Sequence, residues 1–408
     1  MEKFRQSAVL DAADLNMEFH SANEKGKAES KEDINEKTIQ CKPSKLNDDI
    51  KVDVTRDNVR LLGRTYTDSE DGFTYFSWSN SGFEFKFYGT GAEAYFNTNI
   101  PENEIKDNED NMPILSIYLD NMDAPEDVYK IFRLDKKEGW YMLAEGLEEG
   151  YHTITVRKRN RSYFGTLVGV ACGVNQLKIK DGNLKEAPKS KELKLEVIGD
   201  SISCGDGIYA DVNKYGGTQV DGWSTYAAEA ARNLDADLNT IAISGNGLIS
   251  SVFGTTLLEL PAQFPYTDRQ IYREDGKEVK WNYSKYQSDV VVINLGTNDR
   301  AGVGEGKMFT EQDFENTYVE FMEYIKSVYH HCKIIACIGA MGSELKPSIE
   351  KAVERVNEKG RKYVYTLWFT PDIANDGLSA DETHPSLKAH KRYGIELTDK
   401  IKKVLELD

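Results

Sequence analysis

Four short polar blocks contain residues whose types could together hydrolyse an ester. Ser201 ends a Gly-Asp-Ser triplet, Gly245 and Asn298 lie in two further blocks, and His384 is near the end of the chain with Asp381 three residues before it. Ester hydrolysis by a serine needs a nucleophile, a base, a group that orients the base, and donors for the oxyanion. In this interpretation Ser201, His384 and Asp381 are catalytic, and Ser201, Gly245 and Asn298 form the oxyanion hole.

Each block also has a plain structural interpretation. Ser201 alone would often be a helix cap, Gly245 a turn residue, and Asn298 a side chain that stabilises its own turn. Asp381 alone could cap its loop. The segment is not the Gly-x-Ser-x-Gly elbow of α/β-hydrolases, because Ser203 stands where the second glycine would be. The occurrence of all four blocks in this order favours the catalytic interpretation.

The elements that would position these residues follow from apolar runs in the second half of the chain. These runs are residues 193–198, 238–243, 290–295, 334–338 and 364–369. Their continuous hydrophobicity is typical of parallel strands buried on both faces, and helical patterns alternate with them. We therefore predict a three-layer α/β domain with a parallel sheet over residues 193–408. Because ligands collect at the carboxyl ends of such strands, the sheet would bring the blocks together.

The first half of the chain has a different organisation. Residues 1–50 are polar and predict an extension without a core of its own. Over residues 55–182, apolar and polar positions alternate and turn residues recur, which indicates an all-β sandwich of jelly-roll type. Residues 183–192 are polar, contain a proline and are interpreted as a linker. Because this linker is short, we expect the two domains to lie side by side and the sandwich to shape the substrate cleft.

Composition narrows the class of partner. The chain has 408 residues and a formal net charge of −17, so it would repel nucleic-acid phosphates and anionic membrane surfaces. It contains no apolar run of transmembrane or signal-peptide length. Short basic clusters at residues 157–159 and 400–403 are interpreted as solvated faces. The five cysteines are odd in number and widely spaced, which predicts free thiols and a cytoplasmic location. The sequence leaves open whether the chain forms a homo-oligomer.

No cofactor is expected from the sequence. The histidines, cysteines and acidic residues near the four blocks lack the spacing of metal ligands, so we expect no metal. Trp223, Trp281 and Trp368 are candidates for a platform on which a sugar stacks, with Trp223 and Trp368 preferred as substrate-binding residues. Tryptophan is, however, more often a core residue.

The blocks resemble those of the SGNH (GDSL-type) hydrolase superfamily. Its signature positions correspond here to Ser201, Gly245, Asn298 and His384. An all-β domain ahead of them, which opens at residues 58–66, is similar to that of carbohydrate esterase family 2, so the resemblance covers about residues 55–408. It implies a metal-free serine esterase, like acetyl xylan esterases, that removes acetyl groups from β-linked glycans such as acetylated oligosaccharides of xylan. Some members of this family use a backbone carbonyl as the third member, so that role of Asp381 stays open.

Two other functions remain open at this point. One is hydrolysis of lipid or aryl esters by the same residues, since a fold does not determine its substrate. No long apolar lid segment supports a lipase, however. The other is a glycan-binding protein in which the hydrolase is vestigial, against which the intact pair of Ser201 and His384 argues.

Overall fold

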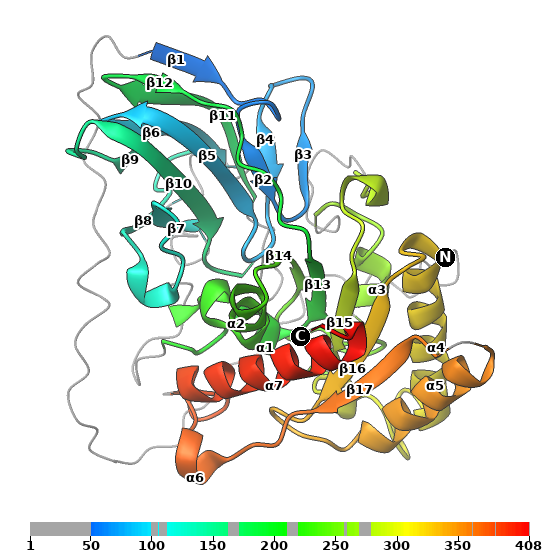
Figure 1. Cartoon of the computed structure of the whole chain (residues 1–408). Coiled ribbons are helices and arrows are strands. Elements are labelled where there is room, and N and C mark those ends of the chain that lie inside the picture. Colours follow the sequence, from blue (N-terminus) through cyan, green and yellow to red (C-terminus); the bar gives the residue numbers. More distant parts are fainter. Residues whose placement is uncertain are drawn as a thin grey trace.

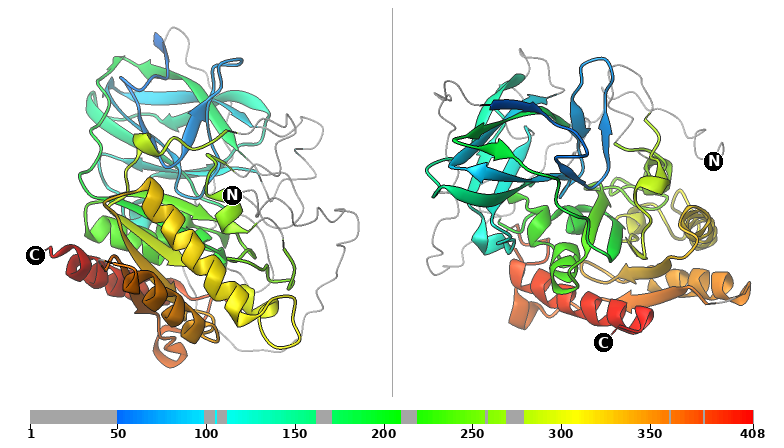
Figure 2. Two further views of the ribbon diagram at one scale, coloured as in Figure 1. Left: turned by 90° about the vertical axis from the view of Figure 1, so that its right-hand side faces the viewer. Right: turned by 45° about the horizontal axis from the view of Figure 1, so that its top comes forward.

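The computed structural model describes most of the chain as two domains that pack against each other. The described residues are 50–98, 105, 112–161, 171–209, 219–256, 259–268, 279–360, 362–379 and 381–407. Figure 1 shows a β-rich domain above and an α/β domain below it, and Figure 2 shows the same contact from two further directions. Almost all of the predicted extension, residues 1–49, lies outside the described residues. Within those residues, no helix has the length and apolar character that crossing a membrane requires.

The first domain is built from antiparallel strands. They are β1 (Ile50–Asp53), β2 (Arg60–Leu62), β3 (Thr65–Thr67), β4 (Thr74–Phe76), β5 (Gly82–Gly89), β6 (Gly91–Thr98), β7 (Ile114–Leu119), β8 (Lys130–Arg133), β9 (Glu138–Ala144), β10 (Gly150–Lys158), β11 (Cys172–Lys180) and β12 (Asn183–Leu184). One 6-stranded sheet has the order β3-β4-β11-β6-β9, with β1 on β11; the other has the order β12-β5-β10-β7-β8, with β2 on β5. A short 3-10 helix, η6 (Pro125–Asp127), precedes β8.

The two sheets enclose one hydrophobic core. Phe83, Phe85 and Phe87 of β5 are fully buried and share this core with Phe96 of β6 and Leu177 of β11, which belong to the other sheet. The alternation of these phenylalanines with polar residues follows from the period of two in a strand that is buried on one face. The predicted β-sandwich is therefore confirmed, while its jelly-roll connectivity stays a prediction.

The sandwich extends beyond its expected limits at both ends. The strand β1 pairs with β11, and β12 pairs with β5 inside the segment that was expected to be a linker. The connection to the second domain is consequently shorter than residues 183–192. A shorter connection holds the two domains more closely together.

The second domain is an α/β fold. Its strands are β13 (Lys194–Gly199), β14 (Asp237–Ala242), β15 (Val290–Asn294), β16 (Lys333–Ile338) and β17 (Val364–Trp368). Its helices are α1 (Ser201–Cys204), η8 (Gly222–Ser224), α2 (Tyr226–Asn233), α3 (Leu260–Gln263), η10 (Tyr283–Lys285), η11 (Asp299–Ala301), α4 (Glu311–Val328), α5 (Lys346–Glu358), α6 (Ile373–Asp376) and α7 (Leu387–Leu405). The strands form a parallel 5-stranded sheet with the order β14-β13-β15-β16-β17.

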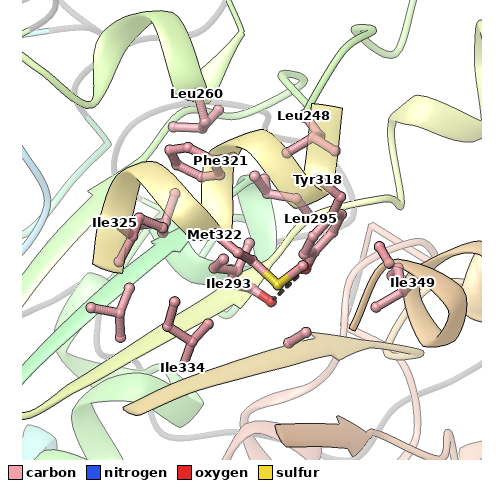
Figure 3. Close-up of a cluster of buried hydrophobic side chains, with 14 of the residues drawn as sticks. Leu248, Leu260, Ile293, Leu295, Tyr318, Phe321, Met322, Ile325, Ile334 and Ile349 are labelled. Carbon is pink, nitrogen blue, oxygen red and sulfur yellow. Dashed lines mark hydrogen bonds between the residues drawn. The ribbon is translucent and has the colours of Figure 1, made fainter. Parts of the chain in front are cut away.

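Helices cover both faces of this sheet, as a three-layer fold requires. Ile293 of β15 and Ile334 of β16 point toward α4, where they pack with Phe321 and Met322 (Figure 3). The alternate residues of the same strands, such as Val292, belong to the core that α2 and α7 cover. The strands β15 and β16 are therefore buried on both faces, which explains their continuous apolar sequences. All five strands lie within one residue of the predicted runs.

The strand order decides where a ligand can bind. The sheet winds in opposite directions from β13 and β15, so the topological switch point lies between the carboxyl ends of these two strands. Ser201 follows β13 and Asn298 follows β15. The two predicted site residues thus flank the position at which open parallel sheets bind their ligands.

Candidate active site

Ser201 is the first residue of α1, directly after the central strand β13. Asp200 caps this short helix, since its Oδ1 accepts a hydrogen bond from the backbone N–H of Ile202 at 3.0 Å. At Gly199 a Cβ atom would lie only 2.1 Å from the hydroxyl oxygen of Ser203, so the strand needs a glycine here to turn into the helix. Ser201 itself is 7% exposed. The local sequence thus places a nearly buried hydroxyl at the end of the strand.

Asn298 connects three of the four blocks. Its Nδ2 donates to the backbone carbonyl of Asn246 at 2.8 Å and lies 3.5 Å from Oδ2 of Asp200. A side-chain amide nitrogen carries two hydrogens, and the second distance is too long for a strong bond. One N–H of the Asn298 side chain therefore anchors the residue to Asn246, and the second N–H can donate to an oxyanion.

Asp299 holds the loop that contains Gly245. Its carboxylate accepts the backbone N–H groups of Leu248, Ile249 and Ser250 at 2.8 to 3.0 Å. Burial raises the pKa of Asp299 to about 6, although these hydrogen bonds favour the charged form. Sequence reasoning missed this residue, which directly follows Asn298.

Gly245 has a φ of 77°, a left-handed conformation that favours glycine. Its carbonyl accepts the N–H of Val252 at 2.8 Å. Within the described part of the chain, its own N–H donates no hydrogen bond. An amide that is free of internal partners is available to a developing oxyanion, as predicted for this residue.

His384 and Asp381 form a tight pair. Nδ1 of His384 lies 2.7 Å from Oδ2 of Asp381, and the backbone N–H of His384 donates to Oδ1 of the same carboxylate at 2.8 Å. The hydroxyl of Ser379 donates to this Oδ1 at 2.5 Å. No described residue bonds Nε2 of His384. The pair therefore has the arrangement in which a carboxylate orients a histidine and the other ring nitrogen faces the reaction.

The electrostatics of the pair suit a general base. Burial would lower the pKa of His384, but the hydrogen bond that it donates to Asp381 and the charges of Asp206, Asp381 and Asp200 raise it above its usual value. Burial would also raise the pKa of Asp381, yet the hydrogen bonds from His384 and Ser379 hold it well below its usual range. Asp381 thus stays ionised and stabilises the imidazolium ion that forms when His384 accepts a proton.

The loop that follows Ser201 folds back on the nucleophile and packs against the block that contains Asp381 and His384. The backbone N–H groups of Gly205 and Asp206 donate to the carbonyl of Ser201, each at 3.0 Å. A Cβ atom on Gly207 would lie 2.3 Å from Oδ2 of Asp381, so Gly207 allows this carboxylate to pack against the loop after Ser201. Among the described residues, no hydrogen bond joins the hydroxyl of Ser201 to His384. Such bonds often tighten only when substrate binds.

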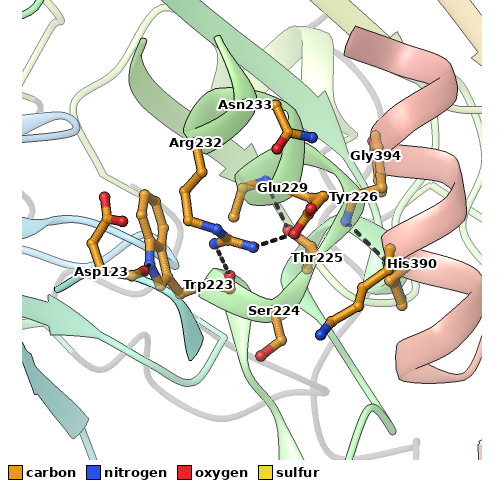
Figure 4. Close-up of polar contacts among 12 residues, drawn as sticks. Asp123, Trp223, Ser224, Thr225, Tyr226, Glu229, Arg232, Asn233, His390 and Gly394 are labelled. Atoms are coloured by element: carbon orange, nitrogen blue, oxygen red, sulfur yellow. Dashed lines mark hydrogen bonds and ion pairs between the residues drawn. The ribbon is translucent and has the colours of Figure 1, made fainter. Parts of the chain in front are cut away.

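The helix α7, which follows His384, is fastened to α2. Nδ1 of His390 accepts the backbone N–H of Tyr226 at 3.2 Å (Figure 4). The hydroxyl of Tyr226 in turn lies 2.8 Å from that of Ser203 and 3.1 Å from Nδ2 of Asn294, at the end of β15. Tyr226 therefore links α7, α1 and the sheet. Because His384 lies just before α7, this link helps to hold His384 near the end of the central strands.

The sandwich reaches the same site through Arg161, just past β10. Its NH1 is 2.9 Å from Oδ2 of Asp206, and the same oxygen accepts the hydroxyl of Ser244 at 2.6 Å. Asp206 is 1% exposed. This carboxylate therefore joins the first block, the second block and the other domain. Its position between two glycines, in the loop shortly after the Gly-Asp-Ser block, is the signal by which the sequence could have revealed it.

The basic cluster at residues 157–159 is buried, so its interpretation as a solvated face is wrong. Arg157, Lys158 and Arg159 are exposed by 8%, 0% and 4%. The guanidinium of Arg159 pairs with Asp221 at 2.8 Å, and Nζ of Lys158 donates to backbone carbonyls. These cations are neutralised or hydrogen-bonded by residues of the second domain and of adjoining loops, which a sequence alone does not show.

The tryptophans have different surroundings. Trp223 is 3% exposed, donates from Nε1 to the carbonyl of Asp123 at 2.5 Å (Figure 4), and has the guanidinium of Arg157 3.5 Å from its ring centroid. It therefore presents no ring face to a sugar, contrary to the expected stacking role. Trp281 is 6% exposed and also packs beside an arginine. Trp368 is half-buried on β17, and a substrate role for it stays a prediction.

Within the described part of the chain, no group of three or more histidine, cysteine, aspartate or glutamate side chains could hold a metal ion. The expectation that the reaction needs no metal stays a prediction. The chemistry that the described residues can supply is that of a serine, a histidine with its carboxylate, and amide donors.

Comparisons with known proteins agree with this chemistry. Residues 197–392 match the model of the GDSL-like lipase/acylhydrolase family, and residues 61–177 match that of the carbohydrate esterase 2 N-terminal domain. The chain carries both of these domains. The resemblance that the sequence motifs indicated is therefore confirmed.

Curated relatives and solved structures are similar over most of the chain. The cellulase/esterase CelE of Acetivibrio thermocellus is 31% identical over 338 residues, which are 81% of this chain and 37% of that protein. The acetylxylan esterase/glucomannan deacetylase of Cellvibrio japonicus is 21% identical, with coverages of 86% and 89%. A family two carbohydrate esterase from Clostridium thermocellum, solved in complex with cellohexaose, has a TM-score of 0.73 and 27% identity and covers 85% of this chain and 99% of its own. The chain thus spans little more than a third of CelE.

We predict that Ser201→Ala lowers kcat by about 10⁴-fold or more, because it removes the nucleophile. The measurement is hydrolysis of a chromogenic acetate ester, with the thermal unfolding midpoint as a check of folding. Ser327→Ala, which removes an exposed hydroxyl on α4, is the matched control and keeps full activity. Activity of Ser201→Ala within tenfold of the wild type would show that another group attacks the ester.

We predict that Asp381→Asn lowers kcat by between about tenfold and 10⁴-fold, because an amide orients the imidazole less well and does not stabilise its cation. Loss of the carboxylate also lowers the pKa of His384, so the acid limb of the pH–rate profile moves to lower pH. His384→Ala is expected to match Ser201→Ala, since residues that act as a unit have non-additive effects. A kinetically silent Asp381→Asn would mean that a backbone carbonyl orients the histidine.

We predict that Asp206→Asn moves the acid limb of kcat/KM to lower pH. The charge of Asp206 raises the pKa of His384, and its removal also takes away the carboxylate that faces the cation of Arg161. Both changes disfavour the imidazolium ion, so the neutral base persists to lower pH. Glu323→Gln, an exposed change on α4, is the control. An unchanged profile together with reduced kcat would assign Asp206 a purely structural role.

Proposed function

We propose that this chain is a serine esterase that removes O-acetyl groups from acetylated xylo-oligosaccharides or related β-linked glycans. The observation that carries the proposal is the pair of His384 and Asp381, 2.7 Å apart, packed against the loop that follows Ser201. The names of the two curated relatives, an esterase and an acetylxylan esterase, support the substrate class. These relatives are carboxylic ester hydrolases.

The first half-reaction forms an acetyl-enzyme. The hydroxyl oxygen of Ser201 attacks the acetyl carbonyl carbon, and Nε2 of His384 takes the hydroxyl proton. The oxyanion that forms is stabilised by the backbone N–H groups of Ser201 and Gly245 and by Nδ2 of Asn298. One such donor is typically worth roughly 10²–10³ in rate. The C–O bond to the sugar then breaks, and His384 returns its proton to the sugar oxygen.

The second half-reaction uses the same groups on water. His384 removes a proton from a water molecule, whose oxygen attacks the acetyl carbon. The oxyanion again accepts hydrogen bonds from the backbone N–H of Gly245 and from Nδ2 of Asn298. Collapse of this intermediate releases acetate, and the proton on His384 returns to Ser201. Asp381 keeps the imidazole oriented and stabilises its cation in both halves without becoming protonated itself.

A cytoplasmic location, and therefore imported oligosaccharides as substrates, is part of the proposal. Its support is the state of the described cysteines. Cys172, Cys204, Cys332 and Cys337 are buried and form no disulfide. Free thiols are typical of a reducing compartment.

One observation favours a second candidate, a protein that binds glycans more than it hydrolyses them. The Clostridium thermocellum esterase of similar fold was solved in complex with cellohexaose, an unacetylated glycan. The free Nε2 of His384 and the free N–H of Gly245 argue for hydrolysis here. Lipid or aryl ester hydrolysis by the same site is separated from both by the choice of substrate.

We predict that kcat/KM for acetylated xylo-oligosaccharides exceeds that for a long-chain aryl ester by at least about tenfold, since each misplaced methylene in a fitted pocket costs that order of discrimination. The measurement is a panel of regiospecifically acetylated xylo- and cello-oligosaccharides, 4-nitrophenyl acetate and 4-nitrophenyl octanoate. Faster hydrolysis of the octanoate would favour a lipid esterase. Tight cellohexaose binding without turnover of any acetate would favour the glycan-binding candidate.

A further inference from the structure

A cavity at the far end of the domain interface has a wall rich in positive charge. Its volume is about 190 Å³, and it lies between the start of β2, the segment before β13 and the amino ends of β13 and β14. The cationic side chains in its wall are Arg56, Arg60, Arg157, Lys191, Lys194 and Lys285. Asp237 is the acidic residue in that described wall. This excess of cations occurs in a chain whose net charge is −17.

Part of this positive charge is neutralised by the protein. Arg60 pairs with Glu84 and, at 3.0 Å, with Asp237, and Lys191 pairs with Asp235 at 2.8 Å. The remaining four cations of the wall form no ion pair with any described carboxylate. The wall therefore retains positive charge after its internal pairs are made.

Arg157 is the buried member of the unpaired set. It is 8% exposed, its NH1 donates to the carbonyl of Asn80 at 3.3 Å, and its Nε has no hydrogen-bond partner among the described residues. Burial and the nearby charge of Arg60 lower its pKa to about 10. The guanidinium also lies over the ring of Trp223, at 3.5 Å from its centroid, but a ring face does not satisfy the Nε–H group. A buried cation with an unsatisfied N–H group is costly unless an anion pairs with it.

The other unpaired cations lie nearer to solvent. Arg56 and Lys285 are exposed, and burial and the charge of Arg56 lower the pKa of Lys285, which shows that the two repel each other. Nζ of Lys194 lies 6.0 Å from the ring centroid of Tyr286. The cavity thus has an open, basic mouth that leads inward to Arg157.

We propose that this cavity binds a small anionic ligand, whose phosphate or carboxylate group lies against Arg157 and is also held by Lys194 and Lys285. Guanidinium and ammonium groups bind such oxyanions through charge-assisted hydrogen bonds. The volume of about 190 Å³ suits one small ring or a short phosphate ester, since a cavity of roughly 150 Å³ holds a benzene molecule. The site does not depend on the proposed esterase activity.

The position of the cavity separates it from the catalytic residues and ties both domains to the ligand. Lys194 and Asp237 begin β13 and β14, whereas Ser201 lies past the carboxyl end of β13, so a strand of 6 residues, roughly 20 Å, lies between them. Arg157 belongs to the sandwich and Lys194 to the α/β domain. A bound anion therefore stabilises the contact between the domains and raises the unfolding temperature.

The test measures the thermal unfolding midpoint of the full chain, and binding by titration calorimetry, at constant ionic strength. The probes are inorganic phosphate, glucose 1-phosphate and glucuronate, with chloride and neutral glucose as references. We expect at least one oxyanion to raise the midpoint above the chloride value in a saturable manner. Binding of the phosphates without glucuronate assigns a phosphate ligand, and the reverse assigns a carboxylate.

Variants distinguish a site from a general salt effect, because phosphate stabilises many proteins by exclusion from their surface. Arg157→Gln and Lys285→Gln are each expected to raise the apparent Kd at least about tenfold, as loss of a charged hydrogen bond predicts. The control is Lys359→Gln, which removes an exposed cation just past the end of α5 and is expected to leave the Kd unchanged. If Arg157→Gln does not fold, Lys194→Gln replaces it, and turnover of 4-nitrophenyl acetate verifies that each variant is intact.

Two results would overturn the proposal. One is the absence of any rise in the midpoint beyond that in chloride for all three oxyanions. The other is a rise that is equal in the wild type, Lys285→Gln and Lys359→Gln, since an effect that ignores the cations of the cavity is not binding in it.

Discussion

The ion pair between Arg64 of the sandwich and Glu196 of β13 is the contact on which the arrangement of the two domains depends. Both side chains are fully buried, and NH2 of Arg64 lies 3.0 Å from Oε1 of Glu196. The guanidinium also donates hydrogen bonds to the carbonyls of Phe264 and Tyr266. Burial would lower the pKa of Arg64, but Glu196 raises it above its usual value. Removal of one partner would leave a buried charge at a cost of about 3–5 kcal/mol. Glu196 lies in β13, the strand that precedes Ser201, so the catalytic domain contains a buried charge that pairs, among the described residues, with an arginine of the sandwich.

The orientation set by that pair brings one face of β10 against the catalytic domain. Arg157 near the end of β10 contacts Trp223, and Arg159 and Arg161, which follow the strand, pair with Asp221 and Asp206. The last contact reaches the nucleophile's own loop, and Arg157 also lines the basic cavity. The sandwich is consequently part of the framework of the active site. A catalytic domain cut free of it would lose the arginines that pair with Glu196, Asp221 and Asp206.

Several buried carboxylates surround one histidine in the catalytic centre. Asp381 bonds His384 directly, while Asp200 and Asp206 act on it through their charge. Burial raises the pKa of Asp200 to about 7, against the hydrogen bond from Ile202 and the charge of His384. Like charges gathered in a poorly solvated site raise one another's pKa. Arg161 of the other domain pairs with one of these carboxylates, Asp206.

The sequence alone determined the parallel sheet and the residues that can act as nucleophile, base and oxyanion donors. Both follow from local patterns, since buried strands read as continuous apolar runs and polar blocks directly after them lie at one edge of the sheet. Only the tertiary structure decided that Trp223 and residues 157–159 are buried, that Asp206 joins the site, and that cations line a cavity. Each of these depends on a partner from a distant segment. A sequence shows that a side chain is charged, but not which residue neutralises that charge or whether water reaches it.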